Sequence, residues 1–188
     1  VMDEVREQAE RDYQLASGLS QDVETDDSVF RQTTARLPWL LIGMLGGIGN
    51  SMILGNFDTT FAAHPEMALY IPLIGGTGGN VGTQSSALVV QGLANSSLDA
   101  NNTWKQILKE SVVALINATI ISMLVYIYNF VRFGATATVS YSVSLSLFAV
   151  VMFASIFGTL VPMTLEKLKI DPAIATGPFI SITNDIIG

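Results

Sequence analysis

The sequence predicts an all-α membrane protein with five transmembrane helices, the second of them broken by a Gly-rich run. Three observations predict this class. Hydrophobic residues make up 49% of the 188 residues and charged residues only 13%, whereas soluble domains carry about 25% charged residues. Long charge-free intervals divide the chain into lengths that suit a lipid bilayer. An acidic segment precedes these intervals and carries the whole net charge of −7.

The acidic segment predicts a helix over residues 3–19, because a narrow apolar stripe runs along it with acids around the rest of its surface. Gly18 and Ser20 are suited to ending that helix, and an acidic linker follows to residue 30. We therefore divide the chain into a connecting helix with its linker (1–30) and a transmembrane domain (31–188). The helix is either a solvated connector or an acidic element that gathers cations near a pore mouth.

The charge-free intervals predict the spans, since a spanning helix needs about 20 apolar residues. Four spans are complete: 37–57, 67–98, 111–131 and 133–165, with the helix of the fourth at 143–165. The fifth begins after Asp171 and is truncated by the end of the chain. Because the chain starts with Val1 and stops inside an apolar run, we expect it to be part of a longer protein.

The basic residues of the short loops predict the orientation, since Lys and Arg collect on the cytoplasmic side. Alternating helices place six of them on one side: Arg31, Arg36, Lys105, Lys109, Lys167 and Lys169. Only Arg132 falls on the other side. We expect a multi-pass protein of the plasma membrane, with its N-terminus in the cytoplasm and the end of the fifth helix outside.

The Gly-rich run reads PLIGGTGGNVGTQ from Pro72 to Gln84 and lies in the middle of the second span. Irregular backbone is tolerated at membrane depth only where it is buried in protein or lines a watery cavity. Small residues also let membrane helices approach closely, but packing does not require Asn80, Thr83 and Gln84. Oxygen dipoles on a backbone that can come close to an ion suit a cation passage. The run therefore favours the transport class.

Asp185 is the one acid well inside a predicted span, 14 residues after Asp171. A carboxylate at such depth costs about 2.5–3.5 kcal/mol on insertion scales, and no Lys or Arg of the spans is available to pair with it. A transported cation is one possible counter-charge, and a protonated Asp bonded to a neighbouring helix is the alternative. Pro178 removes a backbone donor nearby, and the segment adds uncharged oxygens at Thr176, Ser181, Thr183 and Asn184.

Other classes of function are disfavoured by what the sequence lacks. There is no Cys and only one His, His64, which excludes thiolate and multi-histidine metal centres. A basic surface for nucleic acid is missing. A hydrolase needs a nucleophile–base pair or a metal centre, and Asp185 has no such partner in the spans. We therefore expect neither an enzyme nor a nucleic-acid-binding protein.

Three motifs in one chain resemble the MgtE family of Mg²⁺ channels. They are Arg36-Leu-Pro-Trp-Leu before the first span, PLIGGTGGNVGTQSSALVVQGLA from Pro72 to Ala94, and Asp171-Pro-Ala…Gly-Pro…Thr-Asn-Asp185. The resemblance covers the chain from about Arg36 to its end, and the acidic helix is similar to the connecting, or plug, helix of the family.

The resemblance implies a homodimer with five membrane helices per subunit and a pore along the dimer axis, lined by spans two and five. It implies that largely hydrated Mg²⁺ is both the transported ion and a ligand of this site. Asp185 would be the main acidic ligand and Asp171 would lie near the cytoplasmic pore mouth, with the carbonyl of Ile170. Oxygens around the Gly run would complete the metal site, at Gly76, Gly79, Asn80 and Thr83. Membrane lipid and cytosolic regulatory domains outside this chain would be further partners.

Two positions depart from the pattern of the family. Some members have Asn where this chain has Thr83, which keeps a hydroxyl but loses an amide oxygen. Many members read Arg-Gly-Leu-Ala where this chain reads Gln91-Gly-Leu-Ala. The lost Arg alters the contacts available at the end of the second span.

Elementary chemistry agrees with Mg²⁺, which dehydrates reluctantly and is usually bound through one or two carboxylates. One Asp per subunit, doubled by a two-fold axis, would supply two. A proton- or Na⁺-coupled carrier for another cation or solute is the alternative, because broken helices near the midplane also occur in carriers.

Overall fold

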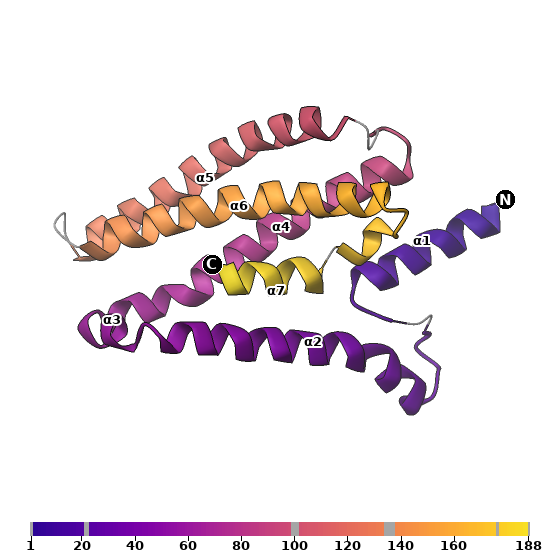
Figure 1. Cartoon of the computed structure of the whole chain (residues 1–188), viewed down its shortest axis with the longest axis horizontal. Helices are drawn as coiled ribbons and strands as arrows, with labels where there is room; N and C mark the ends of the chain where they lie inside the picture. Colours follow the sequence, from indigo (N-terminus) through magenta and orange to yellow (C-terminus); the bar gives the residue numbers. More distant parts are fainter. Residues whose placement is uncertain (1, 21–22, 99–101, 134–137, 176, 188) are drawn as a thin grey trace.

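The computed structural model describes residues 2–20, 23–98, 102–133, 138–175 and 177–187. Within these ranges the chain forms helices and no strand, which confirms the all-α class (Figure 1). The elements are α1 (Met2–Ala16), α2 (Val29–Gly55), α3 (Asp58–Ala63), η1 (Pro65–Tyr70), α4 (Ile71–Ala94), α5 (Thr103–Phe133), α6 (Thr138–Lys167), η3 (Pro172–Ala175) and α7 (Pro178–Ile187).

The N-terminal helix α1 confirms the helix predicted over residues 3–19, and it ends in a glycine cap. Gly18 has a φ of 81°, a left-handed conformation that glycine adopts without steric cost. The N–H of Leu19 donates to the carbonyl of Gln14 and the N–H of Gly18 donates to that of Leu15, each at 3.0 Å. This pair of bonds is a Schellman motif, which satisfies carbonyls left open at the end of a helix.

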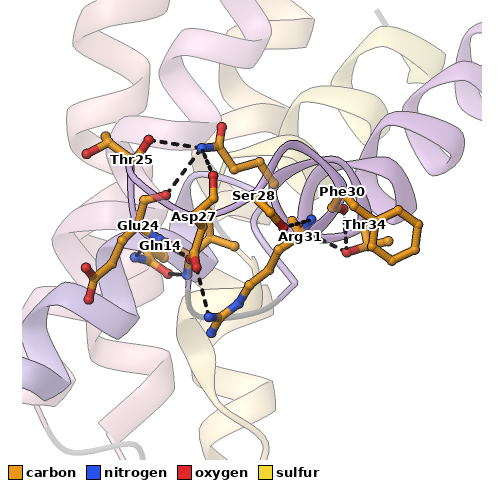
Figure 2. A network of polar contacts seen from close by, with 10 residues as sticks. Gln14, Glu24, Thr25, Asp27, Ser28, Phe30, Arg31 and Thr34 are labelled. Carbon is orange, nitrogen blue, oxygen red and sulfur yellow. Dashed lines mark hydrogen bonds and ion pairs between the residues drawn. The ribbon is translucent and has the colours of Figure 1, made fainter.

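A network of polar contacts joins α1 to α2 across the acidic linker (Figure 2). The side chain of Gln14 donates to the carbonyl of Val23 at 2.9 Å and accepts from its N–H at 3.2 Å. Asp27 pairs with Arg31 at 2.9 Å, and the hydroxyl of Ser28 accepts from the N–H of Arg31 as the N-cap of α2. This cap starts α2 at Val29, eight residues before the first charge-free interval at Leu37.

Three helices of the described ranges are long and apolar enough to cross a membrane: Val29–Gly55, Thr103–Arg132 and Thr138–Lys167. They correspond to the predicted first, third and fourth spans, although α2 ends two residues before the predicted end of the first span and α6 begins five residues after the predicted start of the fourth. The second, α4, has 24 residues but is diluted by its glycines and polar residues, and α7 has ten residues up to Ile187. The predicted count of five spanning helices is therefore not confirmed.

The predicted break in the second span is also not confirmed, because α4 is α-helical without interruption from Ile71 to Ala94. Glycine costs about 1 kcal/mol relative to alanine inside a helix, which is why the run predicted a break. Tertiary packing overrides this propensity here. Gly78, Gly79 and Gly82 are buried against neighbouring helices, and helical geometry continues through them.

Helix α6 is the centre of the bundle and packs along both α5 and α4 (Figure 1). Its buried face includes Leu147, Val151 and Ala154, none of which is exposed to solvent. Helix α6 approaches α4 closely at Gly158. A Cβ added at Gly158 would collide with the carbonyl oxygen of Gly82. Glycine at position 158 thus allows the two helix backbones to touch.

The short helix α7 lies between α2 and α4 and contacts both (Figure 1). On the α2 side, Ile182 fills the space over Gly46, where an added Cβ would collide with its Cγ2 atom. Gly47 and Gly49 have no atom within 4 Å of their Cβ positions. Gly46 therefore allows α7 to pack against α2, whereas Gly47 and Gly49 face open space in the described chain.

Prediction for the helix contact: Gly158→Ala destabilises the protein by about 1–3 kcal/mol, the usual range for overpacking. The added methyl group would collide with the backbone of Gly82, which cannot rotate aside as a side chain can. Gly47→Ala is the matched control, because its methyl enters open space and alanine favours the helix. Thermal unfolding in detergent measures both. Equal unfolding temperatures for the two variants would contradict the close contact.

Candidate functional site

The segment that leads into α7 takes a sharp turn at Gly177. This residue has a φ of 53°, and an added Cβ would collide with the carbonyl oxygen of Ala16 at the end of α1. Pro178 is the first residue of α7, a position where its missing N–H and its fixed φ suit the start of a helix. Pro178 thus begins this helix and does not kink it, and the end of α1 lies against the turn.

The face of α7 toward α4 interlocks with the glycines of the predicted run. An added Cβ at Gly82 would lie 2.5 Å from Ile180 and 2.6 Å from the side-chain nitrogen of Asn184. Gly79 has the hydroxyl of Ser181 at 3.5 Å from its Cβ position. Asn184 is completely buried, and neither polar atom of its side chain has a hydrogen bond within the described structure. Glycines with no side chain therefore let α7 lie directly on the α4 backbone.

This packing brings Asp185 to the glycine run. Its Oδ1 atom lies 3.3 Å from the Cβ position of Gly75, while the residue as a whole is exposed on the surface of the chain. Gly79, one of the predicted site glycines, lies one helical turn after Gly75 in α4 and is next to Ser181. The described residues place no cation in an ion pair with this carboxylate. The structure thus brings an acid and a glycine-lined backbone together. Thr176, a further oxygen donor of this segment, lies outside the described residues.

The other predicted residues of α4 line an open side of the helix next to this contact. Gly76 has no atom within 4 Å of its Cβ position, Asn80 is exposed and Thr83 is half-buried. The exposed side continues toward the end of the helix as a stripe of small and polar residues at positions Gly76, Asn80, Gln84, Ala87 and Gln91. Carboxamides facing lipid would be unfavourable, so this stripe is suited to water or to protein.

Asp171 lies away from this contact, at the other end of the segment that contains η3 and α7. Its Oδ1 atom accepts a hydrogen bond of 2.9 Å from the N–H of Ala173, which caps the start of η3. The same carboxylate lines a cavity of about 510 Å³ together with Asp12 of α1 and Glu166 of α6. The structure therefore does not bring Asp171 and Asp185 into a single group of ligands.

Several residues of the site escaped the sequence analysis. Gly75, and not Gly76, is the glycine nearest to the carboxylate of Asp185, and no sequence signal fixes the rotation of α4 that decides this. Glu110 directly precedes the predicted third span, which begins at residue 111. The structure buries its side chain partly among serines of α4 and α6. The one sequence feature that could have indicated a buried Glu110 is its position next to a long charge-free interval.

The arrangement suits a cation that keeps its water. In the described part of the chain no three side chains of His, Cys, Asp or Glu gather around one point. The site offers one carboxylate, a hydroxyl and accessible backbone. These groups are too few to replace all the waters that coordinate the ion, but they can bind it through those waters. The fold and this site together define a helical membrane protein with an acid placed against a glycine-rich polar helix.

The comparison with protein families agrees with this class. The family model MgtE, described as a divalent cation transporter, matches residues 71–188. This range includes α4, α7 and both acids. The chain belongs to the MgtE family.

Curated relatives carry the name "Magnesium transporter MgtE". The relative from Bacillus subtilis is 30% identical over 187 residues, which cover 100% of this chain and 41% of that protein. The relative from Enterococcus faecalis is 28% identical over 99% of the chain and 41% of its own length. The relative from Thermus thermophilus is 34% identical over 82% of the chain and 34% of its own length. The chain thus spans less than half of each relative.

Prediction for the exposed stripe: the thiol of Asn80→Cys reacts rapidly with a charged, membrane-impermeant methanethiosulfonate reagent. A watery surface admits the reagent and lets the thiol ionise, whereas lipid does neither. The chain has no native cysteine, so the introduced thiol is unique. Ser86→Cys on the same helix is the control and stays unmodified, because Ser86 is completely buried. An unreactive thiol at position 80 would place this stripe against lipid or tightly packed protein.

Proposed function

We propose that the protein transports Mg²⁺ across the plasma membrane, passing the largely hydrated ion along the axis of a homodimer. The observation that carries this proposal is the carboxylate of Asp185, held 3.3 Å from the Cβ position of Gly75 and not paired with any cation of the described residues. A carboxylate at membrane depth needs a counter-charge. The transported ion supplies it.

The ligand set follows from the two helices that meet there. Asp185 of α7 is the main acidic ligand, and Gly76, Gly79, Asn80 and Thr83 of α4 supply oxygens toward the ion's water shell. Mg²⁺ keeps several waters and is usually bound through one or two carboxylates, so one Asp from each of two subunits is sufficient. Asp171, in its cavity with Asp12 and Glu166, attracts cations at the cytoplasmic mouth.

Two surfaces that are exposed in the single chain support the homodimer. The stripe from Gly76 to Gln91 is exposed, and α2 has apolar residues exposed along its length, including Leu40, Leu45 and Met52. In a second copy related by a two-fold axis, the same stripe would face the stripe of the first copy. The two Asp185 carboxylates would then line one path. The relatives are longer than this chain, which leaves room for regulatory domains that would act through α1, whose end lies against Gly177.

Prediction for transport: Asp185→Ala and Asp185→Asn each lower Mg²⁺ uptake into proteoliposomes at least tenfold, because the ion loses its only charged ligand. A Mg²⁺-sensitive dye inside the vesicles measures uptake, and light scattering during size-exclusion chromatography verifies the oligomeric state. Asp58→Asn, which removes an exposed acid in the first turn of α3, is the matched control and retains uptake.

Full uptake by an Asp185→Ala dimer would refute the role of this carboxylate. Uptake that requires a proton or Na⁺ gradient would instead favour a coupled carrier. The same vesicles test this by imposing each gradient in turn.

A further inference from the structure

A second carboxylate, Glu110, is held where three membrane helices meet, and the transport site does not use it. It lies in the second turn of α5. Its Oε1 atom accepts a hydrogen bond of 2.6 Å from the hydroxyl of Ser85 on α4 and another from the hydroxyl of Ser155 on α6. The two hydroxyl oxygens are 3.0 Å apart, and the serines are only 5% and 2% exposed. The carboxylate is therefore fixed in position from two sides.

Glu110 also forms part of the wall of a cavity of about 410 Å³. Carboxamides dominate the polar part of this wall: Gln84, Gln91, Asn95, Gln106 and Asn117. Both serine bonds go to Oε1, so in the described structure Oε2 has no hydrogen bond from protein. The cavity therefore combines one carboxylate, whose Oε2 has no hydrogen bond from the described residues, with several carboxamide side chains in its wall.

Glu110 forms no ion pair with a cationic side chain of the described residues. Ion pairs in the described residues include Arg11–Glu7 and Arg31–Asp27, but none reaches Glu110. Lys109 lines the same cavity and also an adjoining one of about 640 Å³, which contains Lys105 as well. Neighbouring residues on a helix point about 100° apart, and Lys109 forms no ion pair with Glu110. An uncompensated carboxylate in a membrane bundle is costly, and a mobile cation held in the cavity would neutralise it.

The chemistry of the wall selects the kind of cation. Carboxylate and amide oxygens are hard ligands, which suit Mg²⁺ and Mn²⁺ and offer nothing to metals that prefer nitrogen or sulfur. An octahedral ion carries six waters, which occupy about 180 Å³ at roughly 30 Å³ each. A cavity of about 410 Å³ holds that ion with its waters. The amides can then bond to the waters.

We propose that this cavity, the Glu110 cavity, binds one hydrated divalent cation per chain at a site separate from Asp185. Ser85 is two residues from Thr83, so the two side chains point to opposite sides of α4. The Glu110 cavity therefore extends from the Ser85 side of α4 to Gln84 and Gln91, where it adjoins the exposed stripe. Through Ser85 and Ser155 the bound cation stabilises the contact of α4 with α5 and α6.

The test counts bound Mn²⁺ in lipid nanodiscs by electron paramagnetic resonance of the free ion. All variants carry Asp185→Ala, so the transport site does not contribute. Glu110→Gln lowers the count by one Mn²⁺ per chain, while its amide oxygen still accepts from the serines. Gln91→Arg also lowers it by one, because a guanidinium in the cavity replaces the cation. Asp58→Asn leaves the count unchanged.

An unchanged count in Glu110→Gln would overturn the proposal. A loss in Glu110→Gln without a loss in Gln91→Arg would overturn it too, since an arginine in this cavity must compete with a cation. Unfolding temperatures measured without Mn²⁺ verify that the variants fold. Because Mn²⁺ binding is measured with Asp185 removed, the result is independent of whether the protein transports Mg²⁺.

Discussion

The contact of α4 with its neighbours through bare glycine backbone is the constraint on which the rest of the structure depends. Gly82 meets α7 on one side and the backbone at Gly158 of α6 on another. Any side chain at these positions would push the helices apart, since interiors pack without spare volume. The same glycines that weaken α4 as an isolated helix thus stabilise it within the bundle. The helix consequently remains continuous where its sequence predicted a break.

Close packing also decides where polar groups can lie. With its glycines buried, α4 exposes the stripe that begins at Gly76, and α7 presents Asp185 beside it. Ten residues beyond Gly75 along α4, Ser85 reaches Glu110. This helix therefore lies against two carboxylates that form no ion pair with a cation of the described residues. Each is suited to a hydrated ion, because neither is accompanied by the further acids that would replace water around Mg²⁺.

Much of this arrangement can be predicted from the sequence, for physical reasons. Lipid excludes charge, so charge-free intervals locate α2, α5 and α6. For the same reason, an acid inside a predicted span singles out Asp185 as a candidate site residue. The rotation of a helix about its axis is set by tertiary packing, so the sequence could not distinguish Gly75 from Gly76 as the neighbour of Asp185. The cluster at Glu110 was equally hidden, since Ser85 and Ser155 come from helices far apart in the chain.

The most direct test of a cation held between α4 and α7 is a structure of the dimer in lipid with Mn²⁺, whose anomalous signal locates the ion. Density is predicted on the two-fold axis between the Asp185 carboxylates, facing Gly76 and Asn80, at a distance that leaves room for water. Asp185→Asn should abolish it. A dimer in which the Asp185 carboxylates face lipid, or in which the ion lies elsewhere on the axis, would contradict this.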